Sequence, residues 1–379
     1  MRILCQTYEF PPVGGGGSVV AESIAEALGA QGHKIDVVTS HYRGLPRHEQ
    51  RGHLDIYRVP CGRYHLHYSN VLELAALLLP LYRAALRLTR ANSYDFSHTH
   101  FALPTGLIAH RLWRATGLPY ALTLHGSDIP GYNPDRFEFA HVLLRSRWRR
   151  VLSDAALVIS PSAFLAGLTS RYSDVPIRII PNGYKPPLAG YPPKRNCILV
   201  VTRMFERKGV QFFIEAIRDL STDWEIIIVG DGPYLPRLKK LAQNVSPGIR
   251  FMGHLDRSRL GELYGEARIF VFPSIQENFP IVLLEAMHAG CAIITTDAKG
   301  CAEVVGEAGI RAPAGNADAI REALGELMRN PAEVERYASA AATRAKEFEW
   351  NRIADRYHDT FEETFADVQA SGNSRPHVP

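Results

Sequence analysis

The feature that most constrains the fold of this chain is a rhythm of strand-like and helix-like segments that stops at a proline-rich stretch and then restarts. In the first half, the apolar runs "RILCQTY" (2–8) and "KIDVVTS" (34–40) alternate with helical patterns over 18–30 and 71–90. Such alternation favours a parallel sheet covered by helices on both faces. The stretch "PNGYKPPLAGYPPKRN" (181–196) then holds five prolines in sixteen residues, which is typical of a stiff linker.

The alternation begins again after this linker, with strand-like runs from "CILVVTR" (197–203) to "CAIITTD" (291–297). A chain of 379 residues is too long for one ordinary core and suits two domains. We therefore predict an α/β protein with two Rossmann-like, doubly wound domains that face each other across a cleft, where ligands bind beyond the carboxyl ends of the strands. The predicted parts are an N-terminal domain (1–185), a C-terminal domain (186–355), a helix that crosses back (356–368) and a disordered tail (369–379).

Charge is distributed unevenly between the two halves. Residues 1–185 hold 20 Lys and Arg against 13 Asp and Glu, whereas residues 186–379 hold 23 against 26. The basic half, with the strongly basic run "HVLLRSRWRR" (141–150), suggests peripheral contact with an anionic membrane. A core helix with a solvated, Arg-rich face is the alternative explanation.

The cysteines and histidines do not form a recognisable metal site. The five cysteines are scattered without C-x-x-C spacing, which indicates reduced thiols in a cytoplasm. The pairs His65/His67 and His98/His100 lack further ligands at useful spacing, so we expect no metal. The N-terminus has no signal-peptide pattern, and no apolar run is long enough to span a bilayer.

Four consecutive glycines, Gly14 to Gly17, separate the first strand from the first helix. Glycine lets the backbone approach a ligand, and the following helix N-terminus favours an anion, although a merely flexible turn would have the same composition. The run is not G-x-G-x-x-G, because Val19 and Val20 stand where the spaced glycine should be. A dinucleotide-dependent oxidoreductase is therefore disfavoured.

Two short loops in the second half carry groups suited to a nucleotide. In "VTRMFERKGV" (201–210), Arg203 and Lys208 would flank a helix start and clamp a diphosphate. In "VGDGPYLPRL" (229–238), Gly230 either lines a nucleotide or simply makes the turn.

The segment "QENFPIVLLEAMHAG" places two carboxylates eight residues apart. Pro280 fits the first position of a helix, so Glu277 lies in the preceding loop and Glu285 in the first turns. The free N–H groups at Ile281 and Val282 would meet a phosphate between the two acids. This arrangement suits a sugar–diphosphate–nucleoside better than the acid pair of a glycoside hydrolase, which would not need the cations upstream.

These motifs together carry a family resemblance. "HGSDIPGYNPDRF", "IIPNGY", "GDGP", "FMGHL" and "QENFPIVLLEAMHAGCAIITTDAKGCAEVV", in this order and spacing, resemble the retaining nucleotide-sugar glycosyltransferases of family 4, which have the GT-B fold. The resemblance runs from Gly14 to Trp350, and its most specific part is the E-x7-E segment with Arg203 and Lys208 upstream.

The resemblance implies a role for each candidate residue. Glu277 would hold hydroxyls of the transferred sugar and Glu285 the ribose, while Arg203 and Lys208 would neutralise the diphosphate leaving group. His125 would lie near the transferred sugar. The expected catalytic residues are thus His125, Arg203, Lys208 and Glu277. The other residues expected around the sugar donor are Gly15, Gly16, Gly17, Gly230, Leu255, Asn278, Phe279, Pro280, Ile281 and Val282. Gly126 and Asp128 are expected on the acceptor side.

The same resemblance implies the reaction. A sugar would pass from a UDP- or GDP-linked donor to a saccharide, lipid-linked or small-molecule acceptor, with retention, same-face attack and no metal or other cofactor. We expect no nucleic-acid partner and a cytoplasmic location, at the inner face of the membrane if the basic half contacts lipid. A non-catalytic nucleotide-sugar-binding protein would share every residue on the donor side, so that alternative stays open.

Overall fold

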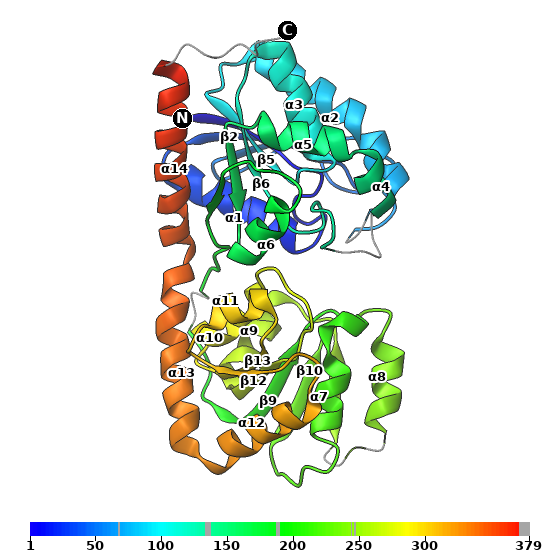
Figure 1. Cartoon of the computed structure of the whole chain (residues 1–379), viewed down its shortest axis with the longest axis vertical. Coiled ribbons are helices and arrows are strands. Elements are labelled where there is room, and N and C mark those ends of the chain that lie inside the picture. The colour runs from blue at the N-terminus through cyan, green and yellow to red at the C-terminus, as the bar shows by residue number, and fades with distance from the viewer. Residues whose placement is uncertain (67–68, 133–137, 187–189, 244, 246–247, 371–379) are drawn as a thin grey trace. The chain divides into compact units, whose positions relative to one another are not determined.

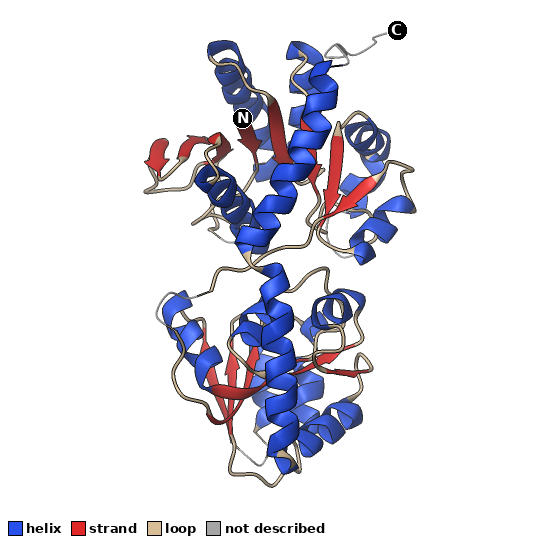
Figure 2. Cartoon of the chain, turned by 90° about the vertical axis from the view of Figure 1, so that its left-hand side faces the viewer, coloured by secondary structure: helices blue, strands red, loops and turns tan. Residues whose placement is uncertain are grey.

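The computed structural model divides the chain into two compact α/β units. It describes residues 1–66, 69–132, 138–186, 190–243, 245 and 248–370. Unit 1 comprises residues 1–182 together with the C-terminal segment from Trp350, and unit 2 comprises Gly183–Glu349. Figure 1 shows both units, coloured along the chain, and Figure 2 shows helices and strands in each.

Unit 1 contains an eight-stranded sheet in the order β3-β4-β2-β1-β5-β6-β7-β8. The short edge strand β3 pairs antiparallel with β4, and the other pairings are parallel. The strands are β1 (Arg2–Gln6), β2 (Lys34–Ser40), β3 (His48–Arg51), β4 (Leu54–Val59), β5 (Phe96–His100), β6 (Tyr120–Thr123), β7 (Leu157–Ser160) and β8 (Ile177–Ile179).

Helices cover both faces of this sheet (Figure 2). They are α1 (Gly16–Ala30), α2 (Val71–Ala91), α3 (Thr105–Thr116), α4 (Glu138–Leu143), α5 (Arg145–Ser153), α6 (Ala163–Ser170) and α14 (Trp350–Ala370). Leu4 and Val38 face the core beneath α2 and α3. Phe96 is paired in register with Ile3 and so faces the opposite side, where it meets Phe361 of α14 with ring centroids 4.8 Å apart.

Helix α2 begins at a capping box. The side chain of Asn70 accepts a hydrogen bond from the Glu73 backbone N–H, and the Glu73 carboxylate accepts one from the Asn70 N–H. The helix then runs through Pro80 to Ala91, so the predicted helical range of 71–90 agrees with the structure. This cap fixes where the apolar first half of α2 starts, at the carboxyl edge of the sheet.

Unit 2 contains a six-stranded parallel sheet in the order β11-β10-β9-β12-β13-β14. Alternate residues of β9 enter different cores: Cys197 and Leu199 lie on one face, and Ile198 and Val200 on the other. Both faces are therefore buried, as the continuous apolar runs predicted. The strands are β9 (Arg195–Val201), β10 (Glu225–Val229), β11 (Ile249–Gly253), β12 (Ala267–Phe272), β13 (Ala292–Thr296) and β14 (Ile310–Ala312).

The helices of unit 2 follow the strands in chain order (Figure 1). They are α7 (Val210–Ala216), α8 (Leu235–Ala242), α9 (Arg257–Glu266), α10 (Ile281–His288), α11 (Lys299–Val305), α12 (Ala317–Arg329) and α13 (Pro331–Ala345), with short 3₁₀ turns η1 (Glu206–Lys208) and η2 (Lys346–Phe348).

The unit boundaries differ slightly from the predicted ranges. Unit 2 begins at Gly183, and the C-terminal helix begins at Trp350 rather than at 356. The reason is packing: Ile353, Ala354 and Tyr357 of α14 are buried, and α14 packs against α1 of unit 1. The helix also runs through Ala370, so residues 369–370 are helical, and the rest of the predicted tail lies outside the described residues.

Candidate active site

The centre of the candidate site in unit 2 is an ion pair between Lys208 and Glu277. Lys208 ends η1, which follows β9, and Glu277 lies in the loop between β12 and α10. Both side chains are nearly buried, and the Ser274 hydroxyl donates a second hydrogen bond to the same carboxylate oxygen of Glu277 over 3.0 Å. A cation and a carboxylate are thus held together at the carboxyl ends of two neighbouring strands, where parallel sheets bind ligands.

Close backbone packing holds this ion pair in place. Gly209 has a φ of 69°, and a Cβ on it would lie 1.9 Å from the carbonyl oxygen of Pro273. A Cβ on Gly300, in the first turn of α11, would lie 2.2 Å from the carbonyl oxygen of Asn278. The Ile275 N–H also donates to the Arg207 carbonyl over 2.9 Å. Only glycine fits at these two positions, so the loops that carry Lys208 and Glu277 are locked against each other.

Glu285 lies on α10 and has a different partner. The Tyr264 hydroxyl, from α9, donates to Glu285 Oε2 over 3.0 Å. Partial burial raises the pKa of the Glu285 carboxyl, while the Tyr264 hydrogen bond and the charge of Arg257 oppose that rise. Glu277, before α10, and Glu285, within it, therefore have separate partners, with no side chain shared between them among these contacts.

The start of α10 lies between the two carboxylates. The helix begins at Ile281, and Pro280 is the residue before it rather than its first residue. Ile281 and Val282 are therefore the first helical residues, whose N–H groups have no partner within the helix. Asn278 and Phe279 belong to the loop before α10 and are buried. The centre of the Phe279 ring lies 5.6 Å from that of Phe348. The segment thus offers backbone N–H groups that favour an anion, with one carboxylate before them in sequence and one after.

The remaining predicted donor residues lie at the ends of β9, β10 and β11. Gly230 has a φ of 130°, and a Cβ there would lie 1.8 Å from the Thr202 carbonyl oxygen. Its N–H donates to the Gly253 carbonyl over 2.7 Å, which brings the loop containing Leu255 beside it. Arg203 is exposed after β9, with its guanidinium 5.6 Å from the centre of the Phe205 ring. The structure gives Gly230 a steric reason to be glycine, so its presence alone does not indicate a ligand.

In unit 1, His125 lies two residues beyond β6 and contacts aromatic and imidazole rings. Its Nε2 is 3.1 Å from Nδ1 of His100, and its ring centre is 4.3 Å from that of Phe101. Burial lowers the pKa of His125 to about 3, so the ring is neutral at neutral pH. A neutral imidazole here can exchange hydrogen bonds with hydroxyl groups but carries no charge for a phosphate.

Asp128 holds the His125 loop rather than facing outward. One of its carboxylate oxygens accepts hydrogen bonds from the N–H groups of His125 and Gly126, at 3.0 and 2.8 Å, and the other accepts one from Ala102 at 2.7 Å. The residue is 2% exposed. The predicted direct contact of Asp128 with an acceptor does not fit this placement. Asp128 is a positioning residue, and Gly126, with a φ of 107°, makes the turn above it.

The glycine run begins helix α1. Gly15 precedes the helix, and Gly16 and Gly17 are its first residues, two positions earlier than the helix start predicted at residue 18. A Cβ on Gly15 or Gly16 would meet no described atom within 4 Å, whereas one on Gly17 would lie 2.5 Å from the Phe101 ring. The helix N-terminus is therefore open at Gly15 and Gly16, next to the aromatic group that contacts His125.

Several residues of the site escaped sequence reasoning. Phe101 has a φ of 72°, an unusual value for a bulky residue and one that marks a constrained position near a site. Ser274 donates a local hydrogen bond to Glu277, whereas Tyr264 contacts Glu285, and Gly300 packs against Asn278, from segments about twenty residues away. The only sequence signal was indirect: Ser274 follows β12 and precedes Glu277 by three residues.

Within the ranges that the structure describes, no group of three or more His, Cys, Asp or Glu is placed to hold a metal ion. No helix in those ranges is both long and apolar enough to cross a membrane.

The two parallel-sheet units and the placement of these loops are those of a GT-B glycosyltransferase. Family models agree: "Glycosyltransferase Family 4" matches residues 14–186, and "Glycosyl transferases group 1" matches residues 195–330. The chain belongs to the family 4 glycosyltransferases.

Known proteins with similar sequences or structures cover nearly the whole chain. It is 27% identical to a phosphatidyl-myo-inositol mannosyltransferase of Mycolicibacterium smegmatis, covering 96% of this chain and 95% of the relative. It is 23% identical to the N-acetyl-alpha-D-glucosaminyl L-malate synthase of Bacillus anthracis, over 94% and 96%. Its fold resembles a sucrose-phosphate synthase from Thermosynechococcus elongatus, with a TM-score of 0.81, 24% identity and coverage of 97% and 100%.

Proposed function

We propose that this glycosyltransferase moves a hexose, with retention of configuration and without a metal ion, from a UDP- or GDP-linked sugar to a hydroxyl of its acceptor. The observation that carries the proposal is the Lys208–Glu277 ion pair beside the start of α10. It combines a cation for a phosphate with a carboxylate for sugar hydroxyls, next to unpaired helix N–H groups. A nucleotide sugar presents these same groups in sequence.

The proposed roles follow the order of groups in the sugar donor. Glu277 accepts hydrogen bonds from sugar hydroxyls, Lys208 and Arg203 contact the diphosphate, and Glu285 accepts hydrogen bonds from the ribose. The backbone from Asn278 to Val282 completes the diphosphate site. The loop containing Leu255 lies beside the base, and Gly230 lines the nucleotide. Two cations and a helix N-terminus stabilise the charge that develops on the departing phosphate.

In the proposed reaction, the bond between the anomeric carbon and the phosphate oxygen breaks as the acceptor hydroxyl attacks the same face. The acceptor proton passes to the departing phosphate oxygen, so the products are the glycoside and the nucleoside diphosphate. His125 lies near the transferred sugar as a neutral hydrogen-bonding group, consistent with its lowered pKa. Gly15 to Gly17 approach the sugar donor or the acceptor from unit 1.

The first experiment is a thermal-shift panel of UDP- and GDP-linked sugars, because a ligand that binds only the folded state raises the melting temperature. The best ligand then enters a turnover assay with wild-type protein, Glu277→Gln and Lys208→Ala, with and without a chelator. We expect stabilisation by at least one nucleotide sugar, chelator-resistant release of nucleoside diphosphate, and loss of release in both variants. No stabilisation by any nucleotide sugar would contradict the proposal.

The second candidate, a non-catalytic nucleotide-sugar binder, would show the same stabilisation but no release of nucleoside diphosphate. Once an acceptor is found, proton NMR of the new anomeric centre tests retention. A product with inverted configuration would contradict the same-face mechanism.

The proposal also includes a lipid-linked or soluble acceptor and a location of the protein at the inner face of the membrane. The names of the relatives include both a lipid acceptor, phosphatidyl-myo-inositol, and a soluble one, L-malate. Unit 1 carries exposed arginines on α2, α3 and α5, which supports peripheral contact with an anionic membrane at its inner, cytoplasmic face. Sedimentation with anionic vesicles at low salt tests that contact, and a protein that stays in the supernatant would contradict it.

A further inference from the structure

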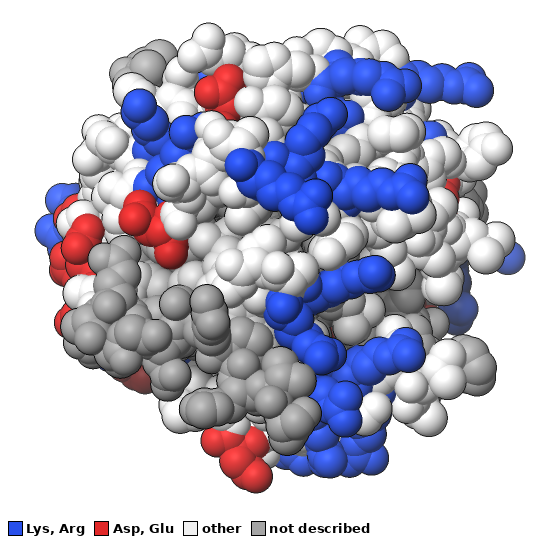
Figure 3. Space-filling model, turned by 90° about the horizontal axis from the view of Figure 1, so that it is seen from above, with Lys and Arg blue, Asp and Glu red and all other residues white. Residues whose placement is uncertain are grey.

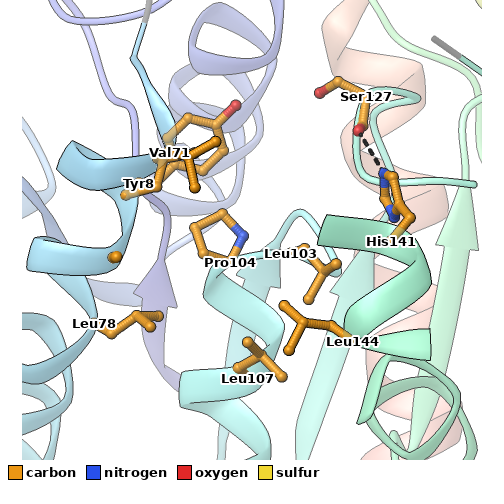
Figure 4. A pocket seen from close by; sticks show the side chains of 11 residues that line it. Tyr8, Val71, Leu78, Leu103, Pro104, Leu107, Ser127, His141 and Leu144 are labelled. Carbon is orange, nitrogen blue, oxygen red and sulfur yellow. Dashed lines mark hydrogen bonds between the residues drawn. The ribbon is translucent and has the colours of Figure 1, made fainter. Parts of the chain in front are cut away.

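Unit 1 has an apolar pocket that the proposed reaction does not yet use (Figure 4). It lies between the first half of α2, the start of α3 and the end of α4, and its walls include Leu74, Leu78, Leu107 and Leu144. Its volume is about 130 Å³. Cavities of about 150 Å³ lined by aliphatic side chains stay dry and bind benzene, so this pocket has room for roughly six carbon atoms.

Exposed apolar side chains surround the mouth of the pocket. Leu72 on α2 is 81% exposed, and Val142 and Leu143 on α4 are 72% and 68% exposed. Val71, which lines the pocket, is 56% exposed. Large apolar side chains gathered around an apolar opening mark an interaction surface.

One side chain that lines the pocket has an unpartnered polar atom. His141 is 7% exposed, its Nε2 lies 3.3 Å from the carbonyl oxygen of Ser127 (Figure 4), and its Nδ1 has no hydrogen-bond partner. Because the carbonyl can only accept, Nε2 donates in this contact. The pocket is thus lined mostly by hydrocarbon, with one imidazole in its wall.

The inner wall of the pocket is continuous with the loops of the candidate active site. Tyr8 lines the pocket, and its ring centre is 4.5 Å from that of Phe101, which in turn contacts His125. Ser127 also lines it, between Gly126 and Asp128 of the His125 loop. A chain in this pocket would place its attached head beside His125.

Arginines follow the pocket on each of the helical segments that line it. Exposed Arg83 lies on α2 five residues after Leu78, exposed Arg111 lies on α3 four residues after Leu107, and exposed Arg145 directly follows Leu144. Figure 3 shows Lys and Arg side chains gathered along one side of the molecule, with few acidic groups among them. Such a surface is complementary to lipid phosphates.

We propose that this pocket binds the proximal part of the hydrocarbon chain of a lipid-phosphate acceptor, whose sugar or polyol head lies at the His125 loop. The inference rests on the proposed function, because it names the acceptor class for that same reaction. The exposed apolar residues and the arginines contact the surrounding anionic lipid. Each methylene buried in the pocket raises affinity about fourfold.

Ala75 and Ala76 provide a matched pair for the test. Both are exposed on α2, but Ala75 lines the pocket and Ala76 does not. Octyl phosphate below its micelle concentration and inorganic phosphate are titrated into wild-type protein, Ala75→Trp and Ala76→Trp by calorimetry. We expect octyl phosphate to bind wild type and Ala76→Trp at least about tenfold more tightly than inorganic phosphate, and Ala75→Trp to lose this difference.

A second pair of variants repeats the comparison on the opposite wall, in case Ala75→Trp fails to fold. Leu144→Gln changes a residue that lines the pocket, and Leu143→Gln changes its neighbour, which does not. Equal binding of octyl phosphate and inorganic phosphate to wild type would overturn the proposal. Equal loss in Ala75→Trp and Ala76→Trp would also overturn it, since the contact would then be a general surface effect. A concentration-dependent dimer that Ala75→Trp disrupts would instead make a second copy of this chain the occupant.

The thermal-shift panel with nucleotide sugars, run on the same preparations, separates this inference from the proposed function. Stabilisation by a nucleotide sugar with no chain-dependent binding rejects the pocket and leaves the transferase intact. Chain-dependent binding with no stabilisation by any nucleotide sugar rejects the transferase, and with it the acceptor role of the pocket.

Discussion

The two units present the same edge of a parallel sheet but equip it differently. In unit 2, the carboxyl edge carries charged groups in contact with one another, with Lys208 against Glu277 and a second carboxylate at Glu285. In unit 1, His125 is kept neutral by burial, and the charge of Asp128 is engaged by backbone N–H groups. One edge thus presents paired charges, and the other a neutral imidazole and a carboxylate already held by backbone N–H groups.

Under the proposed function, this difference would let unit 2 hold a nucleotide sugar while unit 1 takes the acceptor. A diphosphate requires cations and N–H groups at set distances, which restricts unit 2 to a narrow choice of residues. A lipid or saccharide is recognised by shape and a few hydrogen bonds, which many sequences can supply. The predictions below test the contrast, beginning with the largest expected effect.

Replacing Lys208 should have the largest effect. In Lys208→Ala, we expect turnover to fall about 10³-fold, the upper range for loss of one group that stabilises developing charge. The variant also leaves Glu277 nearly buried without its cation, so unit 2 should be less stable. Nucleoside diphosphate release measures the first effect and thermal unfolding the second.

Arg207→Ala is the matched control, since it removes the neighbouring cation, whose guanidinium lies over the Phe205 ring. We expect this variant to retain most of its turnover. Similar losses in Arg207→Ala and Lys208→Ala would mean that general positive charge, and not the Lys208–Glu277 pair, serves the reaction.

The buried histidines of unit 1 should make its stability depend on pH. Burial lowers the pKa of His98 to about 3 and that of His100 well below its usual range. Between about pH 6.5 and pH 3 the unfolded chain therefore binds more protons than the folded one, so the free energy of unfolding falls as pH falls below 6.5. His125, whose pKa burial also lowers to about 3, adds to this effect, so each of the three histidines contributes up to about 1.4 kcal/mol per pH unit, or about 4 kcal/mol per pH unit together.

Urea unfolding at pH 7.5 and 5.5 measures this dependence, and amide hydrogen exchange assigns it to a unit. We expect strands β5 and β6 to lose protection at pH 5.5 while the strands of unit 2 change little. His98→Gln should lower the slope by roughly a third, since His100 and His125 still contribute. Equal loss of protection in both units would show that the contrast between them is wrong.

Asp128→Asn tests whether the polar groups of unit 1 position the loop or act directly. In the wild type, both carboxylate oxygens accept hydrogen bonds from backbone N–H groups. In Asp128→Asn the amide nitrogen would take the place of one of these oxygens, so a buried N–H would lose its acceptor. We expect a loss of about 2 kcal/mol in stability and lower turnover, with nucleotide affinity unchanged. Ser127→Ala is the neighbouring control for both measurements. A change in nucleotide affinity in Asp128→Asn would contradict a positioning role confined to unit 1.

The contrast also explains what sequence reasoning achieved. The strand–helix rhythm predicted both sheets because parallel strands with two buried faces need continuous apolar runs, as in β9 and β12. The edge strand β3 was missed because "HEQR" is polar and has no such pattern. In unit 2, Lys208, Glu277 and Glu285 stand in local motifs, so spacing and the family resemblance could single them out as candidates.

In unit 1, by contrast, the contacts that define the site join distant segments. The stack of Phe101 on His125 and the hydrogen bond from Ala102 to Asp128 depend on how β5 and β6 lie together. The apolar pocket likewise needs α2, α3 and α4 to be placed in space. None of these leaves a spacing pattern in the sequence, so Asp128 was expected on the acceptor side, whereas it is buried and holds the His125 loop.

Replacing Glu285 should have the smallest effect. Comparing it with replacement of Glu277 tests whether the two carboxylates of unit 2 have separate roles. We expect Glu285→Ala to weaken nucleotide binding about tenfold, because it removes charged acceptors for ribose hydroxyls. Glu277→Ala should instead reduce turnover and discrimination between sugars, with the affinity for free nucleoside diphosphate little changed. Tyr264→Phe, which removes only the hydroxyl that orients Glu285, should fall between wild type and Glu285→Ala in affinity. Calorimetry with nucleoside diphosphate and with the intact nucleotide sugar measures both effects. If both carboxylate variants lost turnover with unchanged affinity for both ligands, the two acids would not be separate contacts to one extended sugar donor.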